Sequence, residues 1–367
     1  MKLLFISLGC DKNLVDTEFM LGMIRDAGTF DGQPIEMTDD EYQADIIIIN
    51  TCCFINDAKE ESINTILEMA EYKKTGPLKA LIVTGCLAQR YKEEIRKEIP
   101  EVDAILGTNS YEDIVNAITE ALGGKFYENF ETLEGLPKLT AKRSVTTGGH
   151  FAYLKIAEGC NKRCTYCIIP FARGPLRSRS LESIREEVGK LVAAGYKEVV
   201  LIGIHLGCYG KELAKEGKHV TLYDAVKAAL SVEGVQRVRL GSLESVEVEP
   251  RLLQLMAEEP RLQRHLHLPL QSGCDKILRA MHRPYDTKRF TELVNEIRAQ
   301  VPDVAITTDV IVGFPGETEE DFATTLEFAK QCGFAKMHIF PYSKRKGTPA
   351  AEMKEQVDEA VKSERAA

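Results

Sequence analysis

Strand patterns and helix patterns alternate along most of this chain, and this alternation constrains the fold more than any other feature. In the first half, short runs rich in β-branched residues are separated by helical stretches. The expected strands are Lys2–Leu8, Ala44–Asn50 and Leu78–Thr84, and the expected helices lie near Val15–Ala27, Ala58–Tyr72 and Tyr91–Ile99. Because strands that alternate with helices normally form a parallel sheet, this half is predicted to be an α/β domain with a doubly wound parallel sheet.

The alternation resumes after residue 150. Six strands are expected, at Phe151–Ala157, Glu198–Gly203, Arg237–Ser242, His265–Leu270, Ala305–Val312 and Lys336–Pro341. A complete eight-unit β/α barrel needs roughly 250 residues, so this shorter segment predicts a partial (β/α)6 barrel. The expected domains are residues 1–130, a linker over 131–150, the barrel over 151–352 and a charged tail over 353–367.

Charge and hydropathy exclude several classes of protein. The chain has 367 residues and a net charge of −9, and the negative charge is concentrated in residues 1–150. A protein that coats nucleic acid would be basic throughout. No apolar run approaches the roughly 20 residues of a membrane helix, and the first residues do not resemble a secretory signal. We therefore expect a cytoplasmic protein without a membrane partner.

Ten cysteines are present, and in a reducing compartment clustered cysteines indicate metal binding or catalysis rather than disulfides. Three of them form Cys160-Asn-Lys-Arg-Cys164-Thr-Tyr-Cys167, directly after the first expected barrel strand. That loop lies at the carboxyl end of the sheet, where the sites of α/β proteins form. Three thiolates can hold a 4Fe–4S cluster and leave one iron free for another ligand. The alternative is a zinc site that takes its fourth ligand from a distant residue.

A second set of three cysteines follows the three expected strands of the first half. Cys10, Cys52 and Cys86 each come just after a strand, and neighbouring parallel strands end at the same edge of a sheet. The sequence therefore predicts a second three-cysteine cluster site there. The alternative is three buried, apolar cysteines, and Cys53 is interpreted as a packing residue in either case.

These motifs resemble a known family. The CxxxCxxC spacing resembles the radical S-adenosyl-L-methionine (SAM) superfamily, and the segments around the other three cysteines resemble the methylthiotransferases. Those segments are Ser7-Leu-Gly-Cys10-Asp-Lys-Asn, Asn50-Thr-Cys52-Cys-Phe and Thr84-Gly-Cys86-Leu-Ala-Gln. The resemblance implies an enzyme that inserts sulfur into an unactivated C–H bond and methylates it, with two SAM molecules, two 4Fe–4S clusters and a reducing electron donor. The family normally ends in a TRAM domain, which this sequence is expected to lack.

The two halves of the chain resemble different subgroups of that family. The first 167 residues resemble the RimO type, which modifies an aspartate of a small-subunit ribosomal protein. Segments of the barrel half, such as residues 172–179 and 340–349, resemble the MtaB type, which modifies threonylcarbamoyladenosine next to the tRNA anticodon. Because the radical forms in the barrel, tRNA is the expected acceptor and the ribosomal protein is the alternative. A non-catalytic iron–sulfur electron-transfer or scaffold protein is the alternative from another class.

Basic and polar residues near the barrel mouth are the candidate ligand-binding residues. Arg173, Arg177 and Arg179 are expected to contact substrate phosphates, the alternative being solvated charge that balances an anionic cluster. The resemblance implies that Tyr166, Gly313 and Gly316 bind SAM, the alternatives being a packing aromatic and an ordinary turn. Glu244 and Gln271, each just after an expected strand, are further candidates for SAM binding. Radical hydrogen abstraction needs no general base, so no catalytic acid–base residue is expected. His205, His265 and His267 are interpreted as core or barrel-lining residues, and Cys208, Cys274 and Cys332 as packing residues.

Overall fold

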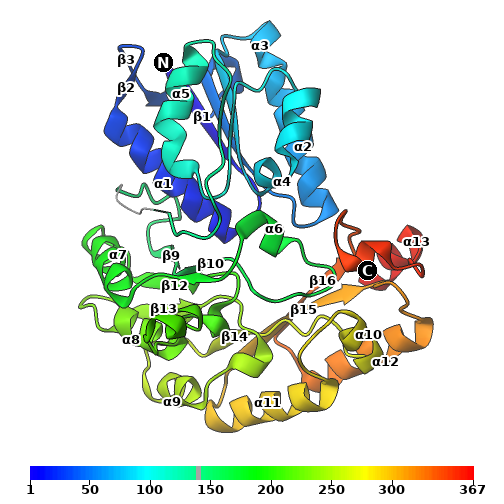
Figure 1. The fold of residues 1–367 in the computed structure, drawn as a ribbon. Coiled ribbons are helices and arrows are strands. Elements are labelled where there is room, and N and C mark those ends of the chain that lie inside the picture. The colour runs from blue at the N-terminus through cyan, green and yellow to red at the C-terminus, as the bar shows by residue number, and fades with distance from the viewer. Residues whose placement is uncertain (138–141) are drawn as a thin grey trace. The chain divides into compact units, whose positions relative to one another are not determined.

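The computed structural model describes residues 1–137 and 142–367 (Figure 1). Contacts divide the chain into two compact units. The first comprises Met1–Thr146 together with Ile169–Pro175, and the second comprises Thr147–Ile168 together with Leu176–Ala367. The linker expected over 131–150 includes residues 138–141, which lie outside the described residues. The domain boundaries expected from the sequence therefore stay a prediction.

The first unit contains a six-stranded, entirely parallel sheet with the order β4-β1-β5-β6-β7-β8. The bounds are β1 Lys2–Ser7, β4 Glu36–Met37, β5 Ile46–Thr51, β6 Ala80–Gly85, β7 Ala104–Leu106 and β8 Tyr127–Asn129. All residues of β5 and β6 are buried, as expected for aliphatic runs that are covered on both faces. The doubly wound parallel sheet predicted from the sequence is confirmed.

Helices cover both faces of this sheet, with α1 and α5 on one face and α2 and α4 on the other (Figure 1). The helices of the unit are α1 Asp11–Ala27, α2 Asn56–Ala70, α3 Tyr72–Thr75, α4 Cys86–Glu98, α5 Ile114–Leu122 and α6 Ile169–Arg173. Two short strands, β2 Thr29–Phe30 and β3 Gln33–Pro34, form a hairpin. Strand β4 pairs with β1 on the side away from β5, so the strand order reverses between β1 and β5. Ligands of doubly wound sheets bind outside the carboxyl ends of the strands at such a reversal.

The second unit is the predicted partial barrel. Its main strands are β9 Phe151–Lys155, β12 Glu198–Ile202, β13 Arg237–Leu240, β14 His265–His267, β15 Ala305–Val312 and β16 Lys336–Pro341. They form two parallel three-stranded sheets, β9-β12-β13 and β14-β15-β16, which a parallel bridge between Ser242 and His267 connects. All six expected strands are present, in sequence order around the barrel.

Seven helices and one hairpin complete the described part of the second unit. The helices are α7 Leu181–Ala193, α8 Leu222–Leu230, α9 Pro250–Glu258, α10 Asp275–Ala280, α11 Thr287–Gln300, α12 Glu319–Cys332 and α13 Glu359–Ala366. The hairpin pairs β10 Ala157–Glu158 with β11 Arg177–Ser178. Local sequence fixes several helix starts: Thr318 and Asp321, for example, form a capping box on α12. No helix of the described residues is long and apolar enough to cross a membrane.

Candidate functional site

The first three-cysteine set lies at one edge of the parallel sheet in unit 1. Cys10 is the N-cap of α1 after β1, Cys52 follows β5 directly, and Cys86 is the first residue of α4 after β6. Strands β1, β5 and β6 are neighbours, so their carboxyl ends bring the three cysteines together. Burial, followed by the nearby thiols of Cys86 and Cys10, raises the pKa of Cys52 to about 11.

Gly9 permits a close approach between the loops that carry Cys10 and Cys52. Its φ is +91°, and a Cβ at this position would lie 2.7 Å from Cys52 Cβ and 3.0 Å from Cys52 Sγ. Both the positive φ and the contact require a glycine. The glycine before Cys10 therefore lets the loop after β1 pack against the loop after β5.

Arg173 is the cation of this site. Its Nε donates to Cys86 Sγ at 3.4 Å, and its Nη1 lies 2.7 Å from the Asp16 carboxylate. A further guanidinium nitrogen donates to Asn13 Oδ1 at 2.5 Å, and Arg173 is only 3% exposed. Burial raises the pKa of the Cys86 thiol, and the guanidinium opposes that rise. Arg173, expected to bind substrate, is thus placed as a partner of a candidate cluster cysteine.

Cys53 lies beside this set with a different partner. Its Sγ donates to the Cys86 carbonyl oxygen at 3.3 Å, and the residue is buried. Burial raises its pKa far above the usual thiol value, with the Cys86 and Cys52 sulfurs adding to the effect. The structure therefore gives Cys53 the surroundings of a packing residue.

The second set, Cys160, Cys164 and Cys167, lies on the irregular loop after β10 in unit 2. Arg283 Nη1 donates to Cys164 Sγ at 3.3 Å. Its other terminal nitrogen donates to both carboxylate oxygens of Glu244, at 2.6 and 2.8 Å. Glu244, expected to bind SAM, therefore holds an arginine against a candidate cluster cysteine, in the same pattern as Asp16 and Arg173.

The remaining residues expected to bind SAM have partners within the chain. Tyr166 is buried, packs edge-on against Phe314 and joins a core cluster, while Gln271 has a φ of +67° and bridges to Val310. The N–H of Gly313 donates to Glu317 Oε1, and that of Gly316 donates to the Glu355 carbonyl, each at 2.8 Å. These four residues line the carboxyl ends of the strands, and their SAM-binding roles stay predictions.

Arg177 and Arg179 are also buried, on and just after β11. Arg179 forms an ion pair with Glu187 and donates to the Lys155 carbonyl at 3.1 Å. The three arginines expected to form a phosphate-facing patch therefore point into the protein. Arg173 and Arg179 form internal ion pairs and hydrogen bonds, and Arg177 is buried, so the substrate-binding role of the three stays a prediction.

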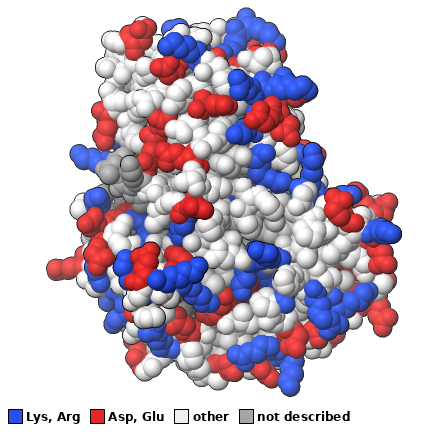
Figure 2. All heavy atoms as spheres, in the orientation of Figure 1, with Lys and Arg blue, Asp and Glu red and all other residues white. Residues whose placement is uncertain are grey.

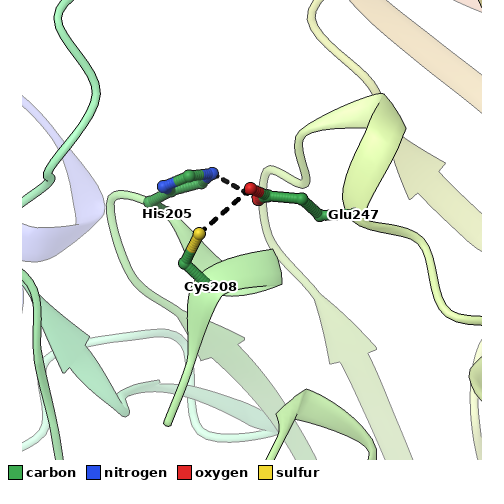
Figure 3. Close-up of side chains that lie close together, drawn as sticks. All are labelled: His205, Cys208 and Glu247. Carbon is green, nitrogen blue, oxygen red and sulfur yellow. Dashed lines mark hydrogen bonds and ion pairs between the residues drawn. The ribbon is translucent and has the colours of Figure 1, made fainter. Parts of the chain in front are cut away.

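Sequence reasoning missed a polar group beside Cys160. His205 Nδ1 lies 3.8 Å from Cys160 Sγ, and its Nε2 lies 2.5 Å from Glu247 Oε2 (Figure 3). Glu247 also accepts from Cys208 Sγ at 3.0 Å and pairs with Lys162, in the cysteine loop, at 3.2 Å. Burial would raise the pKa of Glu247, but the hydrogen bond and charge of His205 hold it well below its usual value. The only sequence signal was a histidine just after a strand end.

Both cysteine sets suit a multi-iron cluster better than a single ion. A tetrahedral zinc ion with bonds of about 2.3 Å to sulfur needs ligand atoms under 4 Å apart. Among the described residues, two groups have ligand atoms that all lie within 4.8 Å of one another, and neither cysteine set is one of them. Each set has three cysteines and an arginine beside one sulfur, whose charge would partly neutralise an anionic cluster. The residues present therefore fit three-cysteine ligation of a cluster.

Comparison with known proteins identifies the family. Residues 2–107 match the model described as uncharacterized protein family UPF0004, and residues 154–329 match the Radical SAM superfamily. The chain is 48% identical over 362 residues to "Ribosomal protein uS12 methylthiotransferase RimO" of Lachnoclostridium phytofermentans, covering 99% of this chain and 80% of the relative. This chain belongs to the radical SAM methylthiotransferase family. Another methylthiotransferase of the same description, from Acetivibrio thermocellus, is 42% identical over 98% of this chain and 79% of the relative.

Solved structures confirm the fold of this methylthiotransferase. The radical SAM methyltransferase TsrM of Kitasatospora setae matches with a TM-score of 0.64 and 13% identity, over 95% of this chain and 73% of that one. The radical SAM enzyme OxsB matches with a TM-score of 0.62 and 12% identity, over 95% of this chain and 54% of that one. At such low identity these likenesses concern the fold alone.

Membership of this family establishes that the chain is an enzyme, and the relatives change the expected acceptor. The chain is a radical SAM enzyme, so a non-catalytic electron-transfer or scaffold protein is not supported, and the Radical SAM domain implies a 4Fe–4S cluster and SAM. The expected tRNA acceptor is not supported either, because the curated relatives favour the alternative, a ribosomal protein. The preference for tRNA depended partly on residues 172–179. Arg173 and Arg179 in that segment form ion pairs within the chain, so their charge is weak evidence for an RNA acceptor.

Proposed function

We propose that this methylthiotransferase acts on an aspartate of ribosomal protein uS12. One observation supports this choice of acceptor. Relatives named for activity on uS12 are 48% and 42% identical to this chain across nearly its whole length. Such identity spans both the cysteine sets and the barrel. It therefore outweighs the short barrel segments that resemble the tRNA-modifying subgroup.

The proposal includes two 4Fe–4S clusters, one on Cys10, Cys52 and Cys86 and one on Cys160, Cys164 and Cys167. Support comes from the convergence of the first set at the edge of one sheet and from the close spacing of the second on one loop. Each set also has a carboxylate-held arginine beside one sulfur, at 3.4 Å for Cys86 and 3.3 Å for Cys164. Partial neutralisation of this kind lowers the cost of burying an anionic cluster.

The chain's own residues hold and shield these sites. Cys160, Cys164 and Cys167 would hold a 4Fe–4S cluster, which, once reduced by an external donor, would supply one electron for cleavage of SAM into methionine and a 5′-deoxyadenosyl radical. Arg283, between α10 and α11, and His205, after β12, both contact the cysteine loop. Glu244 orients Arg283, and Glu247 orients His205. The aromatic packing of Tyr166 and Phe314 keeps the side of the loop near Cys164 and Cys167 apolar. We place SAM at the carboxyl ends of β13 to β15, near Gln271 and Gly313.

The test begins with anaerobic reconstitution of the full chain with iron and sulfide. Two clusters predict about eight irons per chain, and the dithionite-reduced protein should convert SAM to 5′-deoxyadenosine. Incubation with uS12 and with unmodified tRNA, followed by mass spectrometry of peptides and nucleosides, then identifies the acceptor. A methylthio group on uS12 supports the proposal, and one on tRNA instead overturns the acceptor while keeping the enzyme class. About four irons per chain would overturn the two-cluster assignment.

A further inference from the structure

In the part of the chain that the structure describes, two groups of metal-ligating side chains lie outside the cysteine sets. The ligand atoms of His205, Cys208 and Glu247 lie within 4.8 Å of one another, as do those of His267, Asp309 and His338. The first group is already neutralised, because Lys162 and Lys211 approach Glu247 Oε1 at 3.2 and 3.3 Å. Two ammonium groups at that distance repel a further cation. The first group therefore serves the cysteine loop, and only the second remains as a candidate cation site.

The second group is built on three adjacent strands. His267 lies on β14, Asp309 on β15 and His338 on β16, and Asp309 pairs directly with His338 in the β15–β16 register. His267 pairs with Thr307, two residues before Asp309 on the same face of β15. Because all three backbones belong to hydrogen-bonded strands, the side chains start from fixed positions, which favours a preformed site.

The distances match those around a small metal ion. His267 Nε2 lies 3.1 Å from Asp309 Oδ2, and His338 Nδ1 lies 3.2 Å from Asp309 Oδ1. Ligands at about 2.0–2.1 Å from one ion are roughly 2.9–3.4 Å apart in octahedral or tetrahedral geometry. The imidazoles of His267 and His338 and the carboxylate of Asp309 can therefore coordinate one ion after small side-chain rotations, with little change of the backbone.

The surroundings orient His267 and leave Asp309 without a fixed cation. His267 Nδ1 is bonded to Thr307 Oγ1 at 2.9 Å, which directs Nε2 toward Asp309. An outer partner of this kind is usual for a metal-binding histidine. Within residues 1–137 and 142–367, the ion pairs of Asp309 are those with the two histidines, and no lysine or arginine occupies the carboxylate.

We propose that His267, Asp309 and His338 bind one divalent first-row transition-metal ion. Two imidazoles and one carboxylate suit zinc, iron(II) or cobalt(II), and leave coordination positions open. The side chains of His267, Asp309 and His338 are 16%, 26% and 47% exposed, so water or an oxygen ligand can fill those positions. This site shares no residue with either cysteine set, and nothing in the proposed function requires it.

The test uses cobalt(II), added anaerobically to the fully reconstituted enzyme. One cobalt per chain is expected, with weak visible d–d absorption and without the strong near-ultraviolet band of cobalt–thiolate bonds. Asp309→Asn and His338→Gln should each weaken binding by at least about 100-fold, and Thr307→Val by about 10-fold because it only orients His267. His219→Gln, which removes an exposed histidine elsewhere in the unit, is the matched control and should bind as the unaltered enzyme does.

Three results would overturn the site. They are equal cobalt affinity in His338→Gln and His219→Gln, a thiolate band at the first equivalent of cobalt, or no binding at millimolar cobalt. His338→Gln is the decisive variant if Asp309→Asn fails to fold, because His338 is the most exposed of the three. Circular dichroism of each variant before the titration separates loss of fold from loss of ligand.

Discussion

Arg173 donates to the sulfur of Cys86 at 3.4 Å while Asp16 holds the same guanidinium at 2.7 Å. The sequence separation between Arg173 and Asp16 is 157 residues, and both are buried. A cation fixed in this way orients the thiol and lowers the cost of its negative charge. Arg283 and Glu244 repeat the arrangement beside Cys164.

Removal of the Arg173 guanidinium should therefore be strongly destabilising. Arg173→Met leaves the buried Asp16 carboxylate without its partner, which typically costs about 3–5 kcal/mol of the free energy of unfolding. Urea denaturation of the reconstituted protein measures this loss. Arg185→Met, at an exposed pair with Glu182, is the control and should change stability by less than about 1 kcal/mol. The double variant Asp16→Asn, Arg173→Met should recover part of the loss, and equal effects of Arg173→Met and Arg185→Met would contradict the buried pair.

Substitution of Gly9 should disturb the first cysteine set selectively. Gly9→Ala brings a Cβ to 2.7 Å from Cys52 Cβ at a φ of +91°, so the loops after β1 and β5 must separate. We expect the iron content to fall from about eight to about four per chain. Gly124→Ala is the matched control, because it has a φ of +73° but no atom within 4 Å of the added Cβ. Full iron content in Gly9→Ala would show that the close contact is not needed.

Substitution of Cys164 should remove the proposed cluster in unit 2 and leave the proposed cluster in unit 1 in place. Cys164→Ala removes one of three ligands on the loop in unit 2, so 5′-deoxyadenosine formation should fall to background. The first set is held by other elements, and about four irons per chain should remain. Cys332→Ala, at a buried cysteine outside both sets, should retain both clusters. Loss of all iron from Cys164→Ala would contradict two independent sites.

His265 predicts a dependence of stability on pH. Burial lowers the pKa of His265 below its ordinary value of 6.5, with Arg239 and His267 contributing in the same direction. The His265 imidazole therefore binds a proton more readily in the unfolded chain than in the folded one. Its contribution to the free energy of unfolding is complete above pH 6.5 and is lost as the pH falls below that value. Urea denaturation at pH 7.5 and 5.5 should show a smaller difference for His265→Gln than for His219→Gln. An equal difference in both variants would rule out His265 as the source.

The sequence predicted the framework of both units because that framework depends on local patterns. Runs such as Ile46–Thr51 are continuous and β-branched, and all six expected barrel strands occur. The strands β4, β7 and β8 were missed because two or three residues carry no periodic signal. The convergence of the first three cysteines followed from the shared edge of parallel strands, which the strand order then provided.

The roles of the charged residues could not be read from the sequence in the same way. Arg173, Arg177 and Arg179 form a basic stretch without acidic neighbours, which indicated a surface patch. Their surroundings come from distant parts of the chain, such as Asp16 for Arg173. Asn13 and Asp16 lie one helical turn apart on α1, but their burial, which calls for a cation, is known only from the structure. The identity of the cation still depended on the tertiary fold.

The first unit is not encoded by one continuous stretch of sequence, because Ile169–Pro175 belongs to it. A gene fragment that stops at Thr146 would omit α6 and with it the guanidinium that Asp16 and Asn13 hold. It would also omit the Ala172 carbonyl that accepts from Thr108 Oγ1 at 2.7 Å. The sheet edge that carries Cys10, Cys52 and Cys86 is thus completed by residues translated after the cysteine motif of the barrel, so a fragment that ends at Thr146 does not reproduce the surroundings of these three cysteines.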